Sequence, residues 1–366
     1  MTTVATRTAA TLDNVESKLF TAREFRLESG VVLPEITLAY ETYGTLDASG
    51  RRAVLATHGY TGSHHFAGRY RPGGAPRGLN DGDVGSWDKL VGPGKAVDTD
   101  ALFVVSSNML GSSYGSTGPA SIDPRTGKPY GPDFPRIAVA DIVRAQKLLL
   151  DSLGVTHLVA VVGPSYGGFQ AFQWAVQYPG HMSGIVAAVT SPTAPGGPAR
   201  TRALIEQFST DPNWNGGWYY DTGGIPAAMT RIRVATLKSY GIEAQLASEF
   251  PEAGAREAAI VKAAEPWARA FDGNSMVVLR RALEDFDTVP RFDRIRARVL
   301  YVLARTDALF PPAIAPGVLD ALRRAGVNAR YFEIDTERGH LASGLDGEKW
   351  APALRAFMDD LLAAGG

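Results

Sequence analysis

The chain has 366 residues, of which 45% are hydrophobic and 20% charged, and its formal net charge is −1. This composition is typical of a globular protein with enough apolar side chains for a full core, here one core with an insertion. The near-zero charge gives no electrostatic reason to expect a nucleic acid or an anionic membrane as partner.

At the start of the chain, residues 1–14 lack the charged and apolar regions of a signal peptide. Elsewhere no apolar run approaches the roughly 20 residues of a membrane-spanning helix. Cysteine is absent, which excludes disulfides and thiolate chemistry. These features fit a cytoplasmic protein.

The first predicted elements are antiparallel strands, because apolar and polar residues alternate over 24–43 with Gly30 at a turn. Short apolar runs typical of buried strands follow, and helical periodicity over 138–153 and 315–325 separates some of them. This alternation predicts an α/β fold with a mainly parallel, doubly wound sheet. The predicted buried strands are 53–57, 101–106, 158–163, 184–189, 298–304 and 330–334.

The stretch 191–286 has a different character. Its apolar residues recur at helical spacing, as in Met276, Leu279 and Leu283 after a capping Asn274-Ser275, and clusters of proline and glycine divide it. We predict a helical lid inserted between two core strands, with the core formed by 1–190 and 287–366. The alternative is an ordinary helical layer of a larger fold, which the return of the strand pattern at Arg298 disfavours.

The most informative motif is Gly163-Pro164-Ser165-Tyr166-Gly167. It links the predicted strand 158–163 to a helix-compatible segment, 169–177, which is the context of a nucleophile elbow. Glycine is needed at 163 and 167 because a Cβ there would collide with the turn or the neighbouring strand. An idle serine in a glycine-rich turn is the alternative, but the context favours a catalytic Ser165.

A nucleophilic serine needs a base that a third group orients, and α/β-hydrolases carry the three in the order Ser, Asp or Glu, His. Asp307 and His340 follow the predicted strands 298–304 and 330–334. Both therefore belong at the carboxyl ends of strands, where a doubly wound sheet places its site. The alternative candidates for the base and the acid are less favoured because of their positions in the sequence: His181, Asp285, Asp287 and Asp335.

Acyl chemistry also needs backbone N–H donors for the oxyanion. We expect these from Tyr166, directly after the nucleophile, and from Tyr60 in the loop after strand 53–57. His58, His64 and His65 near this loop suggest zinc, but no carboxylate stands at ligand spacing beside them. Such histidines more often support a loop, so no metal is expected.

Beyond these motifs, the chain resembles the homoserine O-acetyltransferase family of α/β-hydrolases over nearly its whole length. The resemblance implies the same Ser-Asp-His triad, a helical lid over a deep tunnel, and a homodimer formed through the lids. It rests on segments 91–100, 107–111, 115–119, 131–135 and 211–214, and on the surroundings of Ser165, Asp307 and His340.

The chain departs from this family where homoserine would bind. An aspartate follows the catalytic histidine in the family and helps to hold the amino group of homoserine, whereas this chain has Leu341. A lid arginine of the family pairs with the homoserine carboxylate; in an ungapped alignment its position is Ile205, with Arg202 nearby. A zwitterion lacking both partners would leave unpaired charges, at a cost of several kcal/mol. We therefore expect these residues to line a pocket for an uncharged alcohol or alkyl group.

These features predict a serine carboxylic-ester hydrolase that cleaves short-acyl, chiefly acetyl, esters of small alcohols without a cofactor. Members of the superfamily with leucine after the histidine include esterases. The alternative is an O-acetyltransferase, in which acetyl-CoA is a co-substrate and homoserine or another alcohol accepts the acyl group. A third hypothesis, a binding or scaffold protein, is disfavoured by the complete Ser-Asp-His set.

Overall fold

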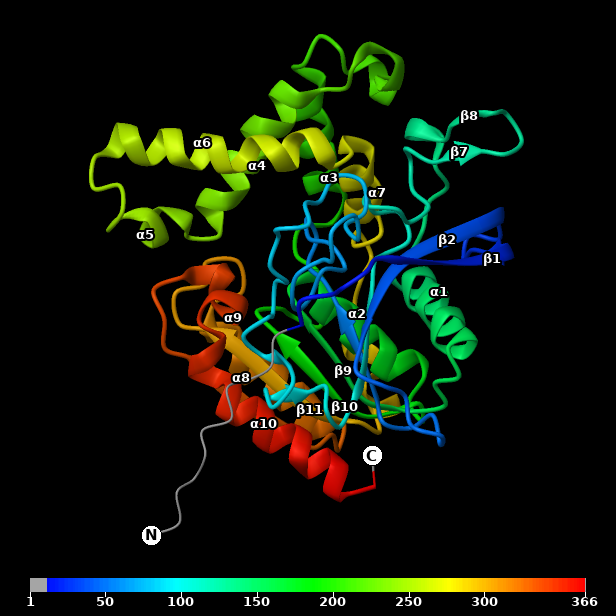
Figure 1. Cartoon of the computed structure of the whole chain (residues 1–366), viewed down its shortest axis with the longest axis vertical. Helices are drawn as coiled ribbons and strands as arrows, with labels where there is room; N and C mark the ends of the chain where they lie inside the picture. The colour runs from blue at the N-terminus through cyan, green and yellow to red at the C-terminus, as the bar shows by residue number, and fades with distance from the viewer. Residues whose placement is uncertain (1–11, 366) are drawn as a thin grey trace.

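The computed structural model describes residues 12–365 as a central sheet flanked by helices, with a group of further helices over one end (Figure 1). The sheet has the strand order β1-β2-β6-β3-β9-β10-β11-β12. The β2 strand runs antiparallel to β1 and β6, and all other neighbours are parallel. The predicted mainly parallel, doubly wound sheet is confirmed.

The predicted buried strands all occur, displaced by no more than two residues at either end. The antiparallel pair begins earlier than expected, at Lys18, and turns near Gly30, which has φ +86°. The strands of the sheet are β1 (Lys18–Arg26), β2 (Val32–Tyr43), β3 (Ala53–Thr57), β6 (Phe103–Ser107), β9 (Leu158–Pro164), β10 (Met182–Ala188), β11 (Arg298–Ala304) and β12 (Ala329–Ile334). Two short pairs lie outside it: β4 (Val91–Gly92) with β5 (Val97–Asp98), and β7 (Ile122–Asp123) with β8 (Lys128–Pro129).

Helices cover both faces of the sheet because successive strand residues point to opposite sides. Leu55 and Val161 pack into one buried cluster with α1 (Val139–Ser152), α2 (Tyr166–Gln177) and α8 (Ala315–Arg324). Their neighbours Val54 and Val162 pack into a second cluster, on the opposite side. There they meet Trp350 of α10 (Gly347–Ala363), which follows the short α9 (Ala342–Leu345). Buried strands with apolar residues on both faces explain the continuous hydrophobic runs in the sequence.

Between β10 and β11 the chain forms helices α3 (Gly197–Ser209), α4 (Pro226–Ser239), α5 (Ile242–Leu246), α6 (Ala253–Ala270) and α7 (Gly273–Arg281), which we call the lid. They lie at the top of Figure 1, over one end of the sheet. Aromatic and apolar side chains, including Phe208, Trp214 and Phe271, form a buried cluster within the lid. Across residues 12–365, no helix is long and apolar enough to cross a membrane.

The start of α7 corrects one expectation. Asn274 and Ser275 do not precede this helix but lie in its first turn, and the N-cap is Asp272. Its carboxylate accepts a hydrogen bond from the backbone N–H of Ser275 at 2.9 Å. An aspartate three residues before that N–H satisfies a free donor of the first turn, which is how side chains cap helices.

Candidate active site

Ser165 lies at a sharp turn between the end of β9 and the start of α2. Its backbone has φ +55° and ψ −118°, a conformation that residues with a side chain rarely adopt. Two hydrogen bonds hold it there: its N–H donates to the carbonyl of Ala188 at 2.9 Å, and its carbonyl accepts from Thr190 Oγ1 at 2.7 Å. These bonds, from the end of β10 and the residue Thr190 just after it, hold Ser165 in its strained backbone conformation.

The glycines around Ser165 are required by close contact with β3. A Cβ added to Gly163 or Gly167 would collide with Thr57, the last residue of that strand. The Thr57 hydroxyl itself lies within hydrogen-bond distance of the carbonyls of Val162 and Gly167, at 3.2 and 3.0 Å. The elbow therefore packs directly on the neighbouring strand, as the glycine positions predict.

Asp307 and His340 come together on loops that follow β11 and β12. The Nδ1 atom of His340 lies 2.8 Å from Asp307 Oδ2, and their side chains are 4% and 0% exposed. The other carboxylate oxygen of Asp307 accepts the backbone N–H groups of Leu309 and Phe310, at 2.8 and 3.3 Å. These bonds fix the carboxylate, and through it the imidazole ring.

Two cavities border Ser165. One, which we call the histidine-side cavity, has a volume of about 510 Å³ and is also bordered by Tyr60, His340 and Leu341. The other, the lid-side cavity, measures about 440 Å³ and extends under α3, α4 and α7. A larger cavity of about 1100 Å³ touches none of the three predicted triad residues. The structure thus brings Ser165 and His340 to one cavity, with Asp307 bonded to the far side of the imidazole.

The other candidates for base and acid lie elsewhere. His181 precedes β10, at the opposite edge of the sheet from Ser165, and its ring stacks on Trp174. Asp335 is exposed and pairs with Arg305. Asp285 likewise forms a surface ion pair, with Arg136.

Tyr60 and Tyr166, the residues of the two expected oxyanion donors, both border the lid-side cavity together with Ser165. Within residues 12–365, neither backbone N–H has a backbone or side-chain acceptor. Tyr166 is the first residue of α2, where N–H groups lack helical partners. The two phenol rings stack, with centroids 6.0 Å apart, and their hydroxyls donate to the α7 carbonyls of Met276 (from Tyr60, 2.6 Å) and Leu279 (from Tyr166, 3.1 Å). Burial raises the pKa of both phenols, which keeps them protonated as donors.

The lid also holds the loop that carries Tyr60. Arg233 of α4 donates to Thr61 Oγ1 at 2.8 Å, and the Trp267 indole of α6 donates to the Thr61 carbonyl at 3.0 Å. The guanidinium carbon of Arg233 lies 4.7 Å from the centre of the Trp267 ring. Together with the bond from the Tyr60 hydroxyl to Met276 of α7, these contacts show that three lid helices set the position of this loop.

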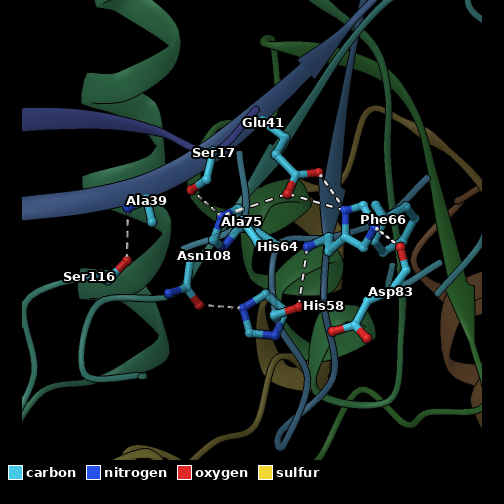
Figure 2. A network of polar contacts seen from close by, with 12 residues as sticks. Ser17, Ala39, Glu41, His58, His64, Phe66, Ala75, Asp83, Asn108 and Ser116 are labelled. Carbon is cyan, nitrogen blue, oxygen red and sulfur yellow. Dashed lines mark hydrogen bonds and ion pairs between the residues drawn. The ribbon is translucent and has the colours of Figure 1, made fainter. Parts of the chain in front are cut away.

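A buried polar network supports the same loop from the side of β2 (Figure 2). Glu41, which is 0% exposed, contacts Nε2 of His64 at 3.8 Å and Nδ1 of His65 at 3.2 Å, and accepts the Tyr43 hydroxyl. Ser17 Oγ lies 2.8 Å from His64 Nε2. Burial lowers the pKa of His64 to about 4. Burial also lowers the pKa of His65, but the hydrogen bond and charge of Glu41 outweigh it and raise that pKa overall.

His58 completes this network. Its Nε2 lies 2.8 Å from Asn108 Oδ1 and its Nδ1 2.8 Å from the Gly59 carbonyl, and burial lowers its pKa to about 4. The three histidines that suggested zinc are thus hydrogen-bonded to protein groups. Across residues 12–365, no group of three or more His, Cys, Asp or Glu side chains is placed to hold a metal ion.

Two aromatic rings pack on the His340 imidazole. Tyr240, at the end of α4, has its ring centroid 4.8 Å away, and Phe310 has its centroid 5.7 Å away. Phe310 follows Asp307 closely in the sequence, but nothing in the local pattern marks Tyr240. Only the folded lid brings Tyr240 to the histidine.

Comparison with known proteins agrees with this geometry. A family model described as the alpha/beta hydrolase fold matches residues 52–344. The chain is 38% identical to a homoserine O-acetyltransferase of Symbiobacterium thermophilum, with 92% of each chain covered. It is 37% identical to a homoserine O-succinyltransferase of Methylibium petroleiphilum, with 93% of each covered. The chain belongs to the homoserine O-acetyltransferase family of α/β-hydrolases.

Solved structures related to this family include both transferases and esterases. Esterase E22 superposes with a TM-score of 0.85 at 28% identity, covering 94% of this chain and 100% of that one. A homoserine O-acetyltransferase from Bacillus anthracis superposes with a TM-score of 0.84, also at 28% identity, covering 94% of this chain and 98% of that one. The fold therefore accommodates both activities.

The structure places Leu341 and Ile205, the two residues predicted to line an apolar pocket, in different surroundings. Leu341 borders the histidine-side cavity, beside His340. Ile205 borders neither cavity and instead packs against the lid cluster, which corrects its prediction as a pocket residue. The α3 residues that do line the lid-side cavity are spaced at three and four, and position 205 lies off that face. They are Arg200, Ala203, Leu204 and Gln207.

Proposed function

We propose that the protein is a serine acyltransferase that moves a short acyl group from acyl-CoA to the hydroxyl of a small alcohol. The observation that carries this proposal is that His340, whose Nδ1 lies 2.8 Å from Asp307 Oδ2, borders the same cavity as Ser165. Curated relatives along nearly the whole chain are homoserine O-acetyl- and O-succinyltransferases. Acyl-CoA would be a co-substrate and not a resident cofactor.

In the first half-reaction, Ser165 Oγ attacks the thioester carbonyl while His340 Nε2 takes the hydroxyl proton. The bond between Oγ and the acyl carbon forms, the carbon–sulfur bond breaks, and the proton passes from His340 to the CoA sulfur. Asp307 stabilises the transient imidazolium. The N–H groups of Tyr60 and Tyr166 would hold the oxyanion.

In the second half-reaction, the acceptor hydroxyl attacks the acyl-enzyme. His340 removes its proton, the new ester bond forms, and the bond to Ser165 breaks as the proton returns to Oγ. Tyr240 and Phe310 keep the imidazole in place during both steps through ring contacts. Their apolar surfaces also exclude water from the histidine, which transfer requires.

Ester hydrolysis is the second candidate, and a specific observation favours it. Leu341 places an apolar side chain beside His340, where the family resemblance implies an aspartate for the homoserine amino group. Esterase E22 is also among the structures with the same architecture. In this reaction, water would replace the alcohol as the group that His340 activates.

A side-by-side assay of the purified protein separates these two activities. One arm measures CoA release from acetyl-CoA and succinyl-CoA with homoserine or simple alcohols, and the other measures hydrolysis of 4-nitrophenyl acetate and ethyl acetate. Acceptor-dependent CoA release faster than hydrolysis is the expected result. Hydrolysis without any acceptor-dependent release would establish the esterase instead.

The Ser165→Ala variant controls for both arms and should lose nearly all activity. A fluorophosphonate probe should label the wild-type protein at Ser165 and leave this variant unlabelled. Full activity in the variant would contradict both candidate reactions, because each needs the acyl-enzyme.

A further inference from the structure

Helix α7 packs into both the lid and the core. Its residues Met276 and Val277 belong to the buried lid cluster. The next two residues, Val278 and Leu279, belong to the core cluster that contains α2. All four side chains are at most 5% exposed. Because close-packed interiors transmit small displacements, a shift of the lid should reach the core through this helix.

Two phenol hydroxyls fasten α7 to the core. The Tyr60 hydroxyl donates to the Met276 carbonyl at 2.6 Å, and the Tyr166 hydroxyl donates to the Leu279 carbonyl at 3.1 Å. Leu279 lies in the last turn of α7, where carbonyls lack helical partners, so Tyr166 also caps this helix. The two rings are nearly parallel, with an interplanar angle of 10°, and reach α7 as one stacked pair. We call these two hydrogen bonds the tyrosine latch.

The same two residues carry the backbone N–H groups that we assign to the oxyanion. In Tyr60 and in Tyr166 the phenol and the N–H are attached to one Cα, so a bond that fixes the phenol also restricts the peptide group. Oxyanion donors stabilise a transition state because they are aligned before the reaction begins. A misplacement of about 1 Å can cost on the order of 10²-fold in rate. The latch is therefore placed to control how well both donors are aligned.

We propose that Tyr60 and Tyr166 are positioning residues whose latch to α7 aligns the two backbone donors for the oxyanion. The phenols act through the N–H groups and not by contact with the reacting atoms. This inference rests on the proposed acyl chemistry of Ser165. It adds a role for two side chains that this chemistry does not use directly, and it makes oxyanion stabilisation depend on how α7 packs against the core.

Removal of one hydroxyl at a time tests the latch. Tyr60→Phe and Tyr166→Phe keep the stacked rings and lose only the bond to α7, and the double variant loses both bonds. Thr288→Val is the matched control, because it also removes one buried hydroxyl: Thr288 is 0% exposed and donates to the Pro192 carbonyl at 2.9 Å. Each protein is assayed with 4-nitrophenyl acetate and acetyl-CoA as acyl donors. Inhibition by butylboronic acid, which forms a tetrahedral adduct with a nucleophilic serine, reports on the oxyanion donors.

Each single Phe variant should lower kcat about fivefold, as expected for the loss of one buried hydrogen bond. The inhibition constant of butylboronic acid should rise by a similar factor. KM should change less than about twofold, because the bound ester has not yet developed an oxyanion. The double variant should lose less than the product of the two single effects, because both bonds hold the same helix. Thr288→Val should lower the Tm and leave kcat and the inhibition constant unchanged.

A lower Tm with unchanged kcat and unchanged boronate inhibition in the Phe variants overturns the positioning role, since the hydroxyls would then only add stability. An equal loss of kcat in Thr288→Val, or a rise in KM at constant kcat in the Phe variants, also overturns it. Thermal melting shows whether each variant is folded. Tyr60 is only half-buried, so Tyr60→Phe carries the test even if Tyr166→Phe does not fold.

Hydrogen exchange separates failure of the latch from failure of the proposed function, because it needs no turnover. Tyr60→Phe should speed backbone amide exchange both in α7 and in the loop 58–62, compared with the wild-type protein and with Thr288→Val. If no ester or thioester is turned over but both segments exchange faster, the latch stands and the acyl chemistry does not. If exchange in either segment stays unchanged, the latch is wrong.

Discussion

At the scale of single residues, the candidate site combines a strained serine with a firmly held aspartate–histidine pair. The positive φ of Ser165 persists because Thr57, Ala188 and Thr190 surround the elbow with hydrogen bonds and close contacts. Asp307 in turn receives two backbone N–H groups in addition to His340. A group held by several bonds loses little orientation during reaction, which is the basis of preorganisation.

The Asp307→Asn variant tests this arrangement. An amide in place of the carboxylate favours the wrong imidazole tautomer and cannot stabilise the imidazolium, so we expect kcat to fall on the order of 10⁴-fold. Initial rates of acyl-CoA consumption measure the change. Asp335→Asn is the matched control, because Asp335 is exposed on the neighbouring loop and pairs only at the surface. A comparable loss in the control would assign the effect to loop structure.

At the scale of elements, the Tyr60 loop is held from two directions. Helices α4, α6 and α7 of the lid bond to Tyr60 and Thr61 from one side. The strand β2 contacts the loop from the other side through Glu41 and two histidines. The donor that we assign to Tyr60 thus depends on both the core and the lid, and movement of either should alter catalysis.

We expect Glu41→Gln to lower the free energy of unfolding by about 3 kcal/mol. When His65 is protonated, removing the Glu41 carboxylate leaves a buried charge without compensation. Denaturant titration measures the change, and kcat should fall with it as the Tyr60 loop loosens.

Glu35→Gln on the same strand is the control for Glu41→Gln. Glu35 is half-exposed and pairs with Arg23 at the surface, so its removal should cost less than about 0.5 kcal/mol. Equal effects of the two substitutions would show that Glu41 has no special role.

At the scale of the whole molecule, acid sensitivity follows from the buried histidines. Of the six histidines, four have a lowered pKa, and burial is the main cause in each: His58, His64, His157 and His181. His65 is raised. A ring with a lowered pKa binds a proton more weakly in the folded than in the unfolded protein, so acid favours unfolding.

We therefore expect the free energy of unfolding to fall as the pH drops below about 6.5 toward 4. Each of the two fully buried rings, His58 and His64, should contribute about 2 kcal/mol of this loss by pH 5. His65 acts oppositely: its stabilisation is present below its unfolded pKa and is lost as the pH rises through its raised folded pKa. Calorimetry in buffers of different ionisation enthalpy should show net proton uptake on unfolding near pH 5.5, and net release would contradict this account.

The sequence by itself determined the sheet and the order of the predicted triad. Buried parallel strands require continuous apolar runs, and the elbow requires glycine at Gly163 and Gly167, so both leave local patterns that can be read directly. Loops that follow strands at the same edge of a sheet must also lie together, so the sequence places Asp307 near His340.

Only the tertiary structure decided which lid residues face Ser165. The packing of α3 and α7 turns Arg200 and Arg280 toward the cavity and Ile205 away from it, and the end of α4 brings Tyr240 to His340. Periodicity shows that a helix has an apolar face but not which neighbour that face meets. Such contacts join residues far apart in the chain, so they depend on how the lid helices pack over the sheet.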